Sequence, residues 1–285
     1  MIDLRQAYRE YKTKGLVPPH RAIWSYYKNR NIQFQYVKKA DWIKNKTSDT
    51  LFIFGSGPSI NSITDEEWSI IKSHDSMGLN HVFLIRHPMT FYYCGYEPGS
   101  NSLLRIDFTK DIRAMYEHSV WFVPMKSLYR LYHPRIIPEF FPPNSKIALF
   151  DYPKVLSLEC DRPFNLADFQ KSLIYRGVMC VGLYFADQLQ YKNIILLGID
   201  LHTYRHFFDD YDVTKTERET YNKTMQEKTG GVFESMIPKG SMYRTMEEYY
   251  YAVNEMFFRP KKVRLYVGNK NSMLSPRIPL YPFFQ

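Results

Sequence analysis

The sequence predicts an α/β fold with a mainly parallel sheet, and three observations support this prediction. Four apolar residues at 51–54 run directly into Gly-Ser-Gly-Pro-Ser, as a buried strand does when it ends in a tight turn. Residues 193–200 (NIILLGID) are continuously apolar between polar neighbours, which is typical of a central parallel strand. Strand patterns alternate with helical ones along the chain, as they do in sheets covered by helices.

The first 47 residues are predicted to form a basic helical extension. Short helices are expected at 3–14 and 20–36, separated by the breaker Gly-Leu-Val-Pro-Pro. Residues 1–47 carry eleven basic and three acidic side chains, so they hold nearly all of the net charge of +9. Aromatic residues are interleaved with this charge. Packing on the main domain and contact with an anionic membrane surface both stay open, whereas no recognisable module supports nucleic-acid binding.

The remaining residues, 48–285, are predicted to form one domain. Strands are expected at 51–54, 76–79, 90–94, 120–124, 193–200 and 263–267, and helices at 64–72, 103–118, 165–189 and 246–258. Thr64 is the expected N-cap of the first of these helices. Two stretches, 129–161 and 203–245, are lid candidates; the first is rich in proline and is expected to be irregular.

Composition narrows the class of protein. The 285 residues are 45% hydrophobic and 24% charged, as in a globular protein. The three cysteines are scattered without a Cys-x-x-Cys pair, which argues against a disulfide framework and a structural zinc site. Neither a signal peptide nor an apolar run long enough to span a bilayer is visible. We therefore expect a cytoplasmic protein, with peripheral contact to the inner membrane if residues 1–47 bind lipid.

Polar residues follow the predicted strands. Because ligands of parallel sheets bind beyond the carboxyl ends of the strands, we expect these residues to converge on a nucleotide or sugar nucleotide. They are Gly55, Ser56, Gly57, Asn80, the turn at 94–97, Asp200 and residues 269–272, which include Asn271 and Ser272; Ser59 adds a hydroxyl donor to the glycine loop. The backbone amides of the glycine loop are expected to approach a phosphate. The loop lacks the Gly-Lys-Ser/Thr of an ATPase and the GxGxxG of a nicotinamide site, so neither activity is favoured.

The segment after residue 200 contains candidate proton-transfer groups. His202 and His206 are candidate general bases, because the ordinary pKa of histidine lies near neutrality. Asp200 could bind a hydroxyl, act as a base or cap a turn. The two histidines stand four residues apart in a loop and lack the glutamate of an HExxH motif, so no metal site is predicted.

Four sequence blocks occur in an order that resembles a known family: LFIFGSGPSI (51–60), MGLN (77–80), RGVMCVGLYFADQLQYKNIILLGIDLH (176–202) and LYVGNKNSML (265–274). Over roughly residues 50–275 the chain resembles the bacterial sialyltransferases of glycosyltransferase family 42 and related lipopolysaccharide-core and capsule transferases, including Kdo transferases. The resemblance implies a single Rossmann-like domain with a lid. It also implies a CMP-sugar donor, a glycan or glycolipid acceptor, inversion at the anomeric carbon, and no metal or cofactor.

The resemblance assigns roles residue by residue. It implies donor contacts for Ser56, Asn80 and Asp200, and closure over the base by Asn271 and Ser272. Further positions complete the set: His202 and His206 fall at or near two family tyrosines beside the phosphate, and Arg176 precedes the Gly-Val pair where a donor-contacting Ser-Gly is usual.

The chain departs from the family at the catalytic base. The family places a histidine shortly before the helix that precedes the last strand, whereas residues 239–250 read KGSMYRTMEEYY. Tyr243 and Arg244 stand nearest. Either the chemistry uses another base, such as His202 or His206, or the donor differs from CMP-sialic acid. Tyr243, Arg244 and the two histidines could instead stabilise the leaving phosphate. Two alternatives remain: a pterin pyrophosphokinase-like enzyme that uses ATP and Mg²⁺, and a non-catalytic interaction protein. The donor sugar, the acceptor and the oligomeric state, including a homo-oligomer, stay open.

Overall fold

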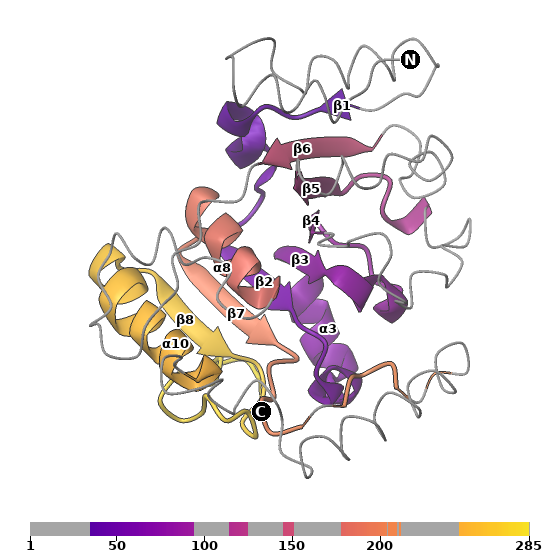
Figure 1. Cartoon of the computed structure of the whole chain (residues 1–285). Coiled ribbons are helices and arrows are strands. Elements are labelled where there is room, and N and C mark those ends of the chain that lie inside the picture. Colours follow the sequence, from indigo (N-terminus) through magenta and orange to yellow (C-terminus); the bar gives the residue numbers. More distant parts are fainter. Residues whose placement is uncertain are drawn as a thin grey trace, which may run out of the picture.

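The computed structural model describes residues 35–93, 114–124, 145–150, 178–203, 205–209, 211 and 245–284. These residues form one eight-stranded sheet in which every neighbouring pair is parallel (Figure 1). The predicted α/β fold with a parallel sheet is therefore confirmed. The expected helix at 3–14, most of those at 20–36 and 103–118, and most of both lid candidates lie outside the described residues.

The strand order creates a switch point at β2. The strands are β1 (Gln35–Tyr36), β2 (Thr50–Phe54), β3 (Asp75–Leu79), β4 (Phe91–Tyr93), β5 (Val120–Pro124), β6 (Lys146–Phe150), β7 (Asn193–Leu197) and β8 (Arg264–Val267). They are arranged β1-β6-β5-β4-β3-β2-β7-β8. From β2 the chain builds outward through β3 to β6 on one side and later through β7 and β8 on the other. The carboxyl ends of β2 and β7 therefore flank the crevice where such sheets bind ligands.

Two strands differ from the sequence-based expectation. β6 lies inside the 129–161 stretch that was expected to be irregular, and β1 occupies the end of the helix expected at 20–36. β6 extends the sheet by pairing with β5 from Val120↔Lys146 to Pro124↔Phe150. The sequence signal of this strand is weak, because the run has only five residues and lies in a stretch rich in proline.

Helices cover both faces of the sheet. They are α3 (Asp65–Lys72), α8 (Val178–Gln188) and α10 (Met246–Val253), with the short helices η1 (Lys39–Asn45), η2 (Pro58–Ser62), η3 (Asn80–Ile85), η6 (Asn254–Phe258) and η7 (Arg259–Lys261). β2 divides the core, because Leu51 and Ile53 pack with α8 and α10 whereas Phe52 and Phe54 pack with Ile71 of α3. Among the described residues, no helix combines the length and the apolar character needed to cross a bilayer.

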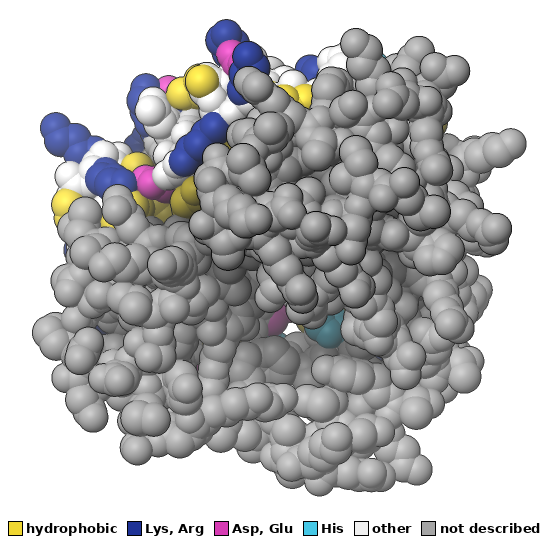
Figure 2. Space-filling view, turned by 45° about the horizontal axis from the view of Figure 1, so that its top comes forward, with side chains coloured by type: hydrophobic (Ala, Val, Ile, Leu, Met, Phe, Trp, Pro, Cys, Tyr) yellow, Lys and Arg dark blue, Asp and Glu magenta, His cyan; other side chains and the backbone are white. Residues whose placement is uncertain are grey.

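Residues 35–46 of the basic extension pack on the sheet. The Trp42 ring is 2% exposed and meets Phe122 at 5.0 Å and Phe185 at 5.7 Å between centroids. β1 pairs with β6 at the sheet edge. In this part of the extension the aromatic residue serves packing while Lys38, Lys39 and Lys44 are exposed. In Figure 2, several lysine and arginine side chains lie close together on the part of the surface that is drawn in colour. The domain boundary at residue 47 remains a prediction.

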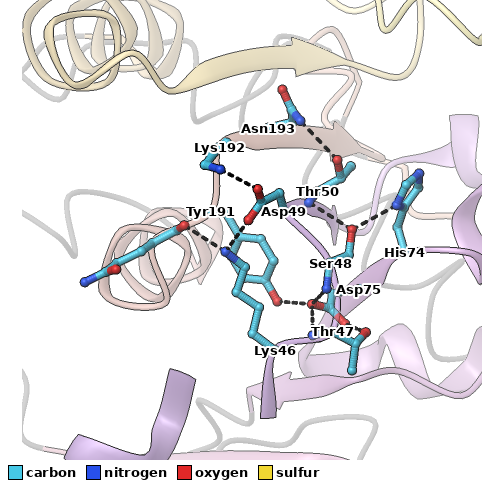
Figure 3. Close-up of polar contacts among 11 residues, drawn as sticks. Lys46, Thr47, Ser48, Asp49, Thr50, His74, Asp75, Tyr191, Lys192 and Asn193 are labelled. Atoms are coloured by element: carbon cyan, nitrogen blue, oxygen red, sulfur yellow. Dashed lines mark hydrogen bonds and ion pairs between the residues drawn. The ribbon is translucent and has the colours of Figure 1, made fainter. Parts of the chain in front are cut away.

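A buried carboxylate ties together the amino ends of the central strands (Figure 3). Asp75 is fully buried and accepts hydrogen bonds from Thr47 N at 2.9 Å, Thr47 Oγ1 at 2.5 Å, Ser48 N at 3.0 Å and Tyr191 Oη at 2.6 Å. Burial, together with this carboxylate, raises the pKa of Tyr191, so the phenol stays a donor. The network fixes β2 between β3 and β7, and it thereby sets where their carboxyl ends meet.

We expect His87 to make folding sensitive to acid. Its ring is 8% exposed and lies 4.7 Å from Trp68. Burial, with a smaller contribution from Lys72, lowers its pKa from 6.5 to about 4. Between these values the unfolded chain binds a proton that the folded chain does not, so stability falls as the pH falls through this window. The expected loss is about 2–3 kcal/mol.

Urea unfolding between pH 7 and pH 4 measures this loss. Against the wild type, His87→Phe should unfold with a shallower dependence of stability on pH, because phenylalanine cannot take up a proton in the unfolded state. Identical pH profiles for the two proteins would contradict the assignment to His87.

Candidate functional site

The loops after β2 and β7 are joined by backbone hydrogen bonds at the switch point. Gly55 N donates to Leu197 O at 2.7 Å, and Gly57 N donates to Gly198 O at 2.8 Å. A Cβ at Gly57 would lie 2.4 Å from Asp200 Oδ2, so this close approach requires glycine. Gly55 and Gly57 therefore serve packing between the loops. The expectation that their amides face a phosphate does not hold, because both amides are paired within the protein.

Asp200 joins three strand-end loops. The carboxylate is 3% exposed; Oδ2 accepts from Ser59 N at 3.0 Å and Oδ1 accepts from Asn269 Nδ2 at 3.1 Å. The Asp200 carbonyl accepts from Met273 N at 3.2 Å. Asp200 thus holds the loops after β2, β7 and β8 in one arrangement. The structure places it as a positioning residue, and its direct contact with a nucleotide remains a prediction.

A cavity of about 380 Å³ lies at this junction, in the size range of small-molecule sites. Its lining comes from η2, from the start of α3 and from the loops after β7 and β8: Pro58, Ser59, Ser62, Ile63, Glu67, Asp200, His202, Gly268, Asn269, Lys270 and Asn271. The Ser59 hydroxyl is buried and has no hydrogen-bond partner within the described part of the chain. A buried hydroxyl left without a partner is costly, which makes Ser59 a candidate ligand contact.

His202 is oriented to accept a proton. Its Nδ1 lies 3.0 Å from the Asp200 carbonyl oxygen, and because a carbonyl only accepts, Nδ1 must carry the hydrogen. In the neutral ring the lone pair then resides on Nε2. His202 is exposed and lines the cavity, so a ligand hydroxyl can reach this nitrogen.

His206 and Ser56, two predicted site residues far apart in sequence, are brought together. His206 Nδ1 lies 2.9 Å from Ser56 Oγ, and Phe207 N donates to Ser56 O at 2.9 Å. The His206 ring stacks on Phe208 with centroids 5.1 Å apart. The segment 205–209 therefore lies along the glycine loop. His206 is not among the residues that line the Ser59 cavity, so its contact with Ser56 forms a separate histidine site.

The other predicted residues have mixed roles. Asn80 lies at the carboxyl end of β3 with φ 51°, and its carbonyl accepts from Tyr92 Oη. Asn271 lines the cavity, and its backbone N–H donates to Asn269 Oδ1 at 2.9 Å. Ser272 is buried, and its hydroxyl donates to Ile199 O at 2.5 Å, which joins the loop after β8 to the loop after β7. The remaining three, Arg176, Tyr243 and Arg244, lie outside the described residues.

Two charged residues of the lining were not predicted individually. Glu67 forms the capping box of α3, with Oε2 accepting from Thr64 N at 2.9 Å, so its charge is already engaged. Lys270 forms no ion pair among the residues that the structure describes. Its place in the Gly-Asn-Lys-Asn-Ser run directly after the last strand is the signal that could have found it. Lys270 is the one cation among the described lining residues, beside the carboxylates of Glu67 and Asp200, which accept hydrogen bonds from neutral donors, so it is the candidate partner for a phosphate.

Metal ligands do not cluster in the described ranges: no three histidine, cysteine, aspartate or glutamate side chains come together there as ligands would. Chemistry without a metal remains a prediction, and the assay proposed below includes a chelator for that reason.

Comparison with known proteins establishes the fold. Neither a protein-family model nor a curated protein sequence matches the chain. The structure of the sialyltransferase Cst-II in complex with CMP matches with a TM-score of 0.50 and 17% identity, over 82% of this chain and 86% of that one. The monofunctional α-2,3-sialyltransferase Cst-I from Campylobacter jejuni matches with a TM-score of 0.48 and 18% identity, over 82% of this chain and 81% of that one. The likeness to Cst-II shows that the chain shares its overall fold.

Proposed function

We propose that the protein is an inverting glycosyltransferase that moves a sialic acid, Kdo or a similar sugar from a CMP-activated donor to a glycan or glycolipid acceptor. The cavity at the switch point carries this proposal, because it combines a buried unpartnered hydroxyl (Ser59), a cation (Lys270) and a histidine whose Nε2 can accept a proton (His202). The fold is shared with Cst-II, whose structure contains CMP.

The proposed reaction uses these groups in order. Lys270 and the Ser59 hydroxyl contact the donor phosphate. His202 Nε2 removes the proton of the acceptor hydroxyl, whose oxygen attacks the anomeric carbon from the face opposite CMP. The bond from the anomeric carbon to the CMP oxygen breaks, and the charge on the departing phosphate is stabilised by Lys270. His206, paired with Ser56, is the alternative base, and Tyr243 and Arg244 stay candidates for stabilising the leaving group.

The cellular setting is also part of the proposal. A cell-surface acceptor, such as lipopolysaccharide or capsule, suits a cytoplasmic enzyme held at the inner membrane. Residues 1–47 would provide that contact with anionic lipid through their eleven basic side chains.

Isothermal titration with CMP in the presence of EDTA tests the donor site. We expect saturable binding without a metal. Lys270→Gln should weaken it by about tenfold, because a charge-assisted contact to the phosphate is lost. Lys262→Gln is the matched control: this lysine is exposed and likewise forms no ion pair among the described residues, but it lies at the end of η7 away from the cavity lining.

Each failure has a distinct meaning. Absence of binding at millimolar CMP, with the protein folded, would contradict the donor assignment. ATP turnover that requires Mg²⁺ would favour the pyrophosphokinase-like alternative. CMP binding without transfer from any CMP-sugar would favour the non-catalytic one.

A further inference from the structure

A second cavity, of about 560 Å³, adjoins the first along η2. Pro58, Ser59 and Ser62 line the first cavity, whereas Ile60 and Asn61 line the second, and Ile63 lines both. The remaining lining comes from α3, from the end of η3 and from the segment after β7: Asp65, Trp68, Lys72, Ile85, Arg86, His87 and Tyr211.

Aromatic rings form much of the lining of this cavity. The Trp68 indole stacks on Phe54 of β2 with centroids 5.7 Å apart and an interplanar angle of 9°. The His87 ring lies 4.7 Å from the indole and is itself buried, so Trp68 is held in place on two sides. Tyr211 contributes a third ring. Rigid aromatic surfaces of this kind suit the C–H faces of a sugar ring at little cost in conformational entropy.

Cations outnumber carboxylates among the lining residues of this cavity. Lys72 and Arg86 line it, and neither forms an ion pair with any carboxylate in the part of the chain that the structure describes. Asp65 is the single carboxylate among the lining residues. Two cations without internal partners beside an aromatic surface favour a ligand that carries an anionic group.

Arg86 adopts a backbone conformation that has a cost. Its φ is 56°, in the left-handed region where glycine or asparagine is favoured and a long side chain is strained. Arg86 is the C-cap of η3, where this conformation is a common way for a helix to end, and Lys262 ends η7 in the same way, so the conformation fixes where Arg86 lies without marking a site by itself. The helix η3 begins at Asn80, directly after β3, and ends at Arg86. It therefore links the carboxyl end of β3 to Arg86.

The second cavity adjoins the His206 site. Asn61 Nδ2 donates to Phe207 O at 2.8 Å, and Phe207 is the neighbour of His206, which contacts Ser56. The same segment continues to Tyr211 in the second cavity. A molecule bound there would therefore lie next to the groups that η2 and the glycine loop present to the first cavity.

We propose that this cavity is an acceptor subsite for an acidic sugar, in which Arg86 and Lys72 pair with the sugar carboxylate while Trp68 and Tyr211 contact its ring. The assignment to the acceptor rests on the proposed glycosyltransferase function. The acidic sugar would position the acceptor for transfer, and the subsite would give the enzyme a preference for acceptors that already end in a charged residue.

Titration of the full-length protein with 3′-sialyllactose and with lactose, followed by saturation-transfer NMR, tests this subsite. We expect the acidic trisaccharide to bind at least about tenfold more tightly than lactose, with an affinity that falls as salt is added. Arg86→Gly should weaken the trisaccharide by about tenfold or more without unfolding the protein, because glycine relieves the left-handed strain. Lys72→Gln should act in the same direction, and Lys262→Gln should have no effect.

Equal binding of the two saccharides, or unchanged trisaccharide affinity in Arg86→Gly and Lys72→Gln, would overturn the subsite. CMP titration of the same samples separates the two proposals. Normal CMP binding with no saccharide preference would refute the subsite alone. A clear preference for the acidic saccharide without CMP binding would refute the transferase and with it the acceptor assignment.

Discussion

Replacement of His202 by alanine is expected to lower kcat by about 10²–10⁴-fold, the usual contribution of a general base. The hydrogen bond from Nδ1 to the Asp200 carbonyl, at 3.0 Å, leaves Nε2 as the basic nitrogen of a ring that belongs to the cavity lining. The same substitution should change the affinity for CMP by less than about threefold, because Lys270 and Ser59 are the proposed phosphate contacts. Initial rates of sugar transfer from a CMP-sugar, together with CMP titration, give both values.

His206→Ala is the matched control, because it removes the histidine beside Ser56 and leaves His202 untouched. We expect it to reduce the rate less than His202→Ala does. The opposite order, with His202→Ala retaining most of its activity and His206→Ala losing it, would contradict the assignment and transfer the role of base to His206.

Replacement of Asp75 by alanine is expected to lower the free energy of unfolding by about 3–5 kcal/mol. The substitution removes the acceptor for Thr47 N, Thr47 Oγ1, Ser48 N and Tyr191 Oη, and the side chain at position 75 is fully buried (Figure 3). The Tyr191 hydroxyl would be left buried without this acceptor, whereas Thr47 is exposed and Ser48 half-buried, so their donors can turn to water. Urea unfolding at neutral pH measures the loss.

Tyr191→Phe provides the graded comparison for Asp75→Ala, because it removes one of the donors and keeps the carboxylate. We expect it to cost about 1–2 kcal/mol. A loss below about 1 kcal/mol for Asp75→Ala would show that the network does not hold the amino ends of β2, β3 and β7 together.

The fold was largely predictable because its central strands are strong local signals. The apolar runs of β2 and β7 and the Thr64 capping box all appear where the sequence places them. β6 was missed because prolines surround it, and β1 because two residues carry no periodicity. Short strands such as these are decided by pairing with their neighbours, β1 with β6 and β6 with β5, more than by their own residues.

The site was predictable only in outline. Parallel strands place their carboxyl ends together, so the convergence of Ser59, Asp200 and Asn271 follows from topology. The packing role of Gly55 and Gly57 did not follow, because their partners belong to a loop that comes much later in the chain. The Arg86 cavity was invisible as well, since a left-handed turn leaves no mark in the residue pattern.

A crystal structure of the protein with a non-hydrolysable CMP-sugar tests the central claim most directly. We predict that the nucleotide occupies the cavity between η2 and the loops after β7 and β8, with its phosphate beside the Ser59 hydroxyl and Lys270 and the anomeric carbon within reach of an acceptor oxygen held at His202 Nε2. A nucleotide bound at another place, or a cavity that stays empty at millimolar ligand, would contradict the assignment of this protein as a CMP-sugar glycosyltransferase.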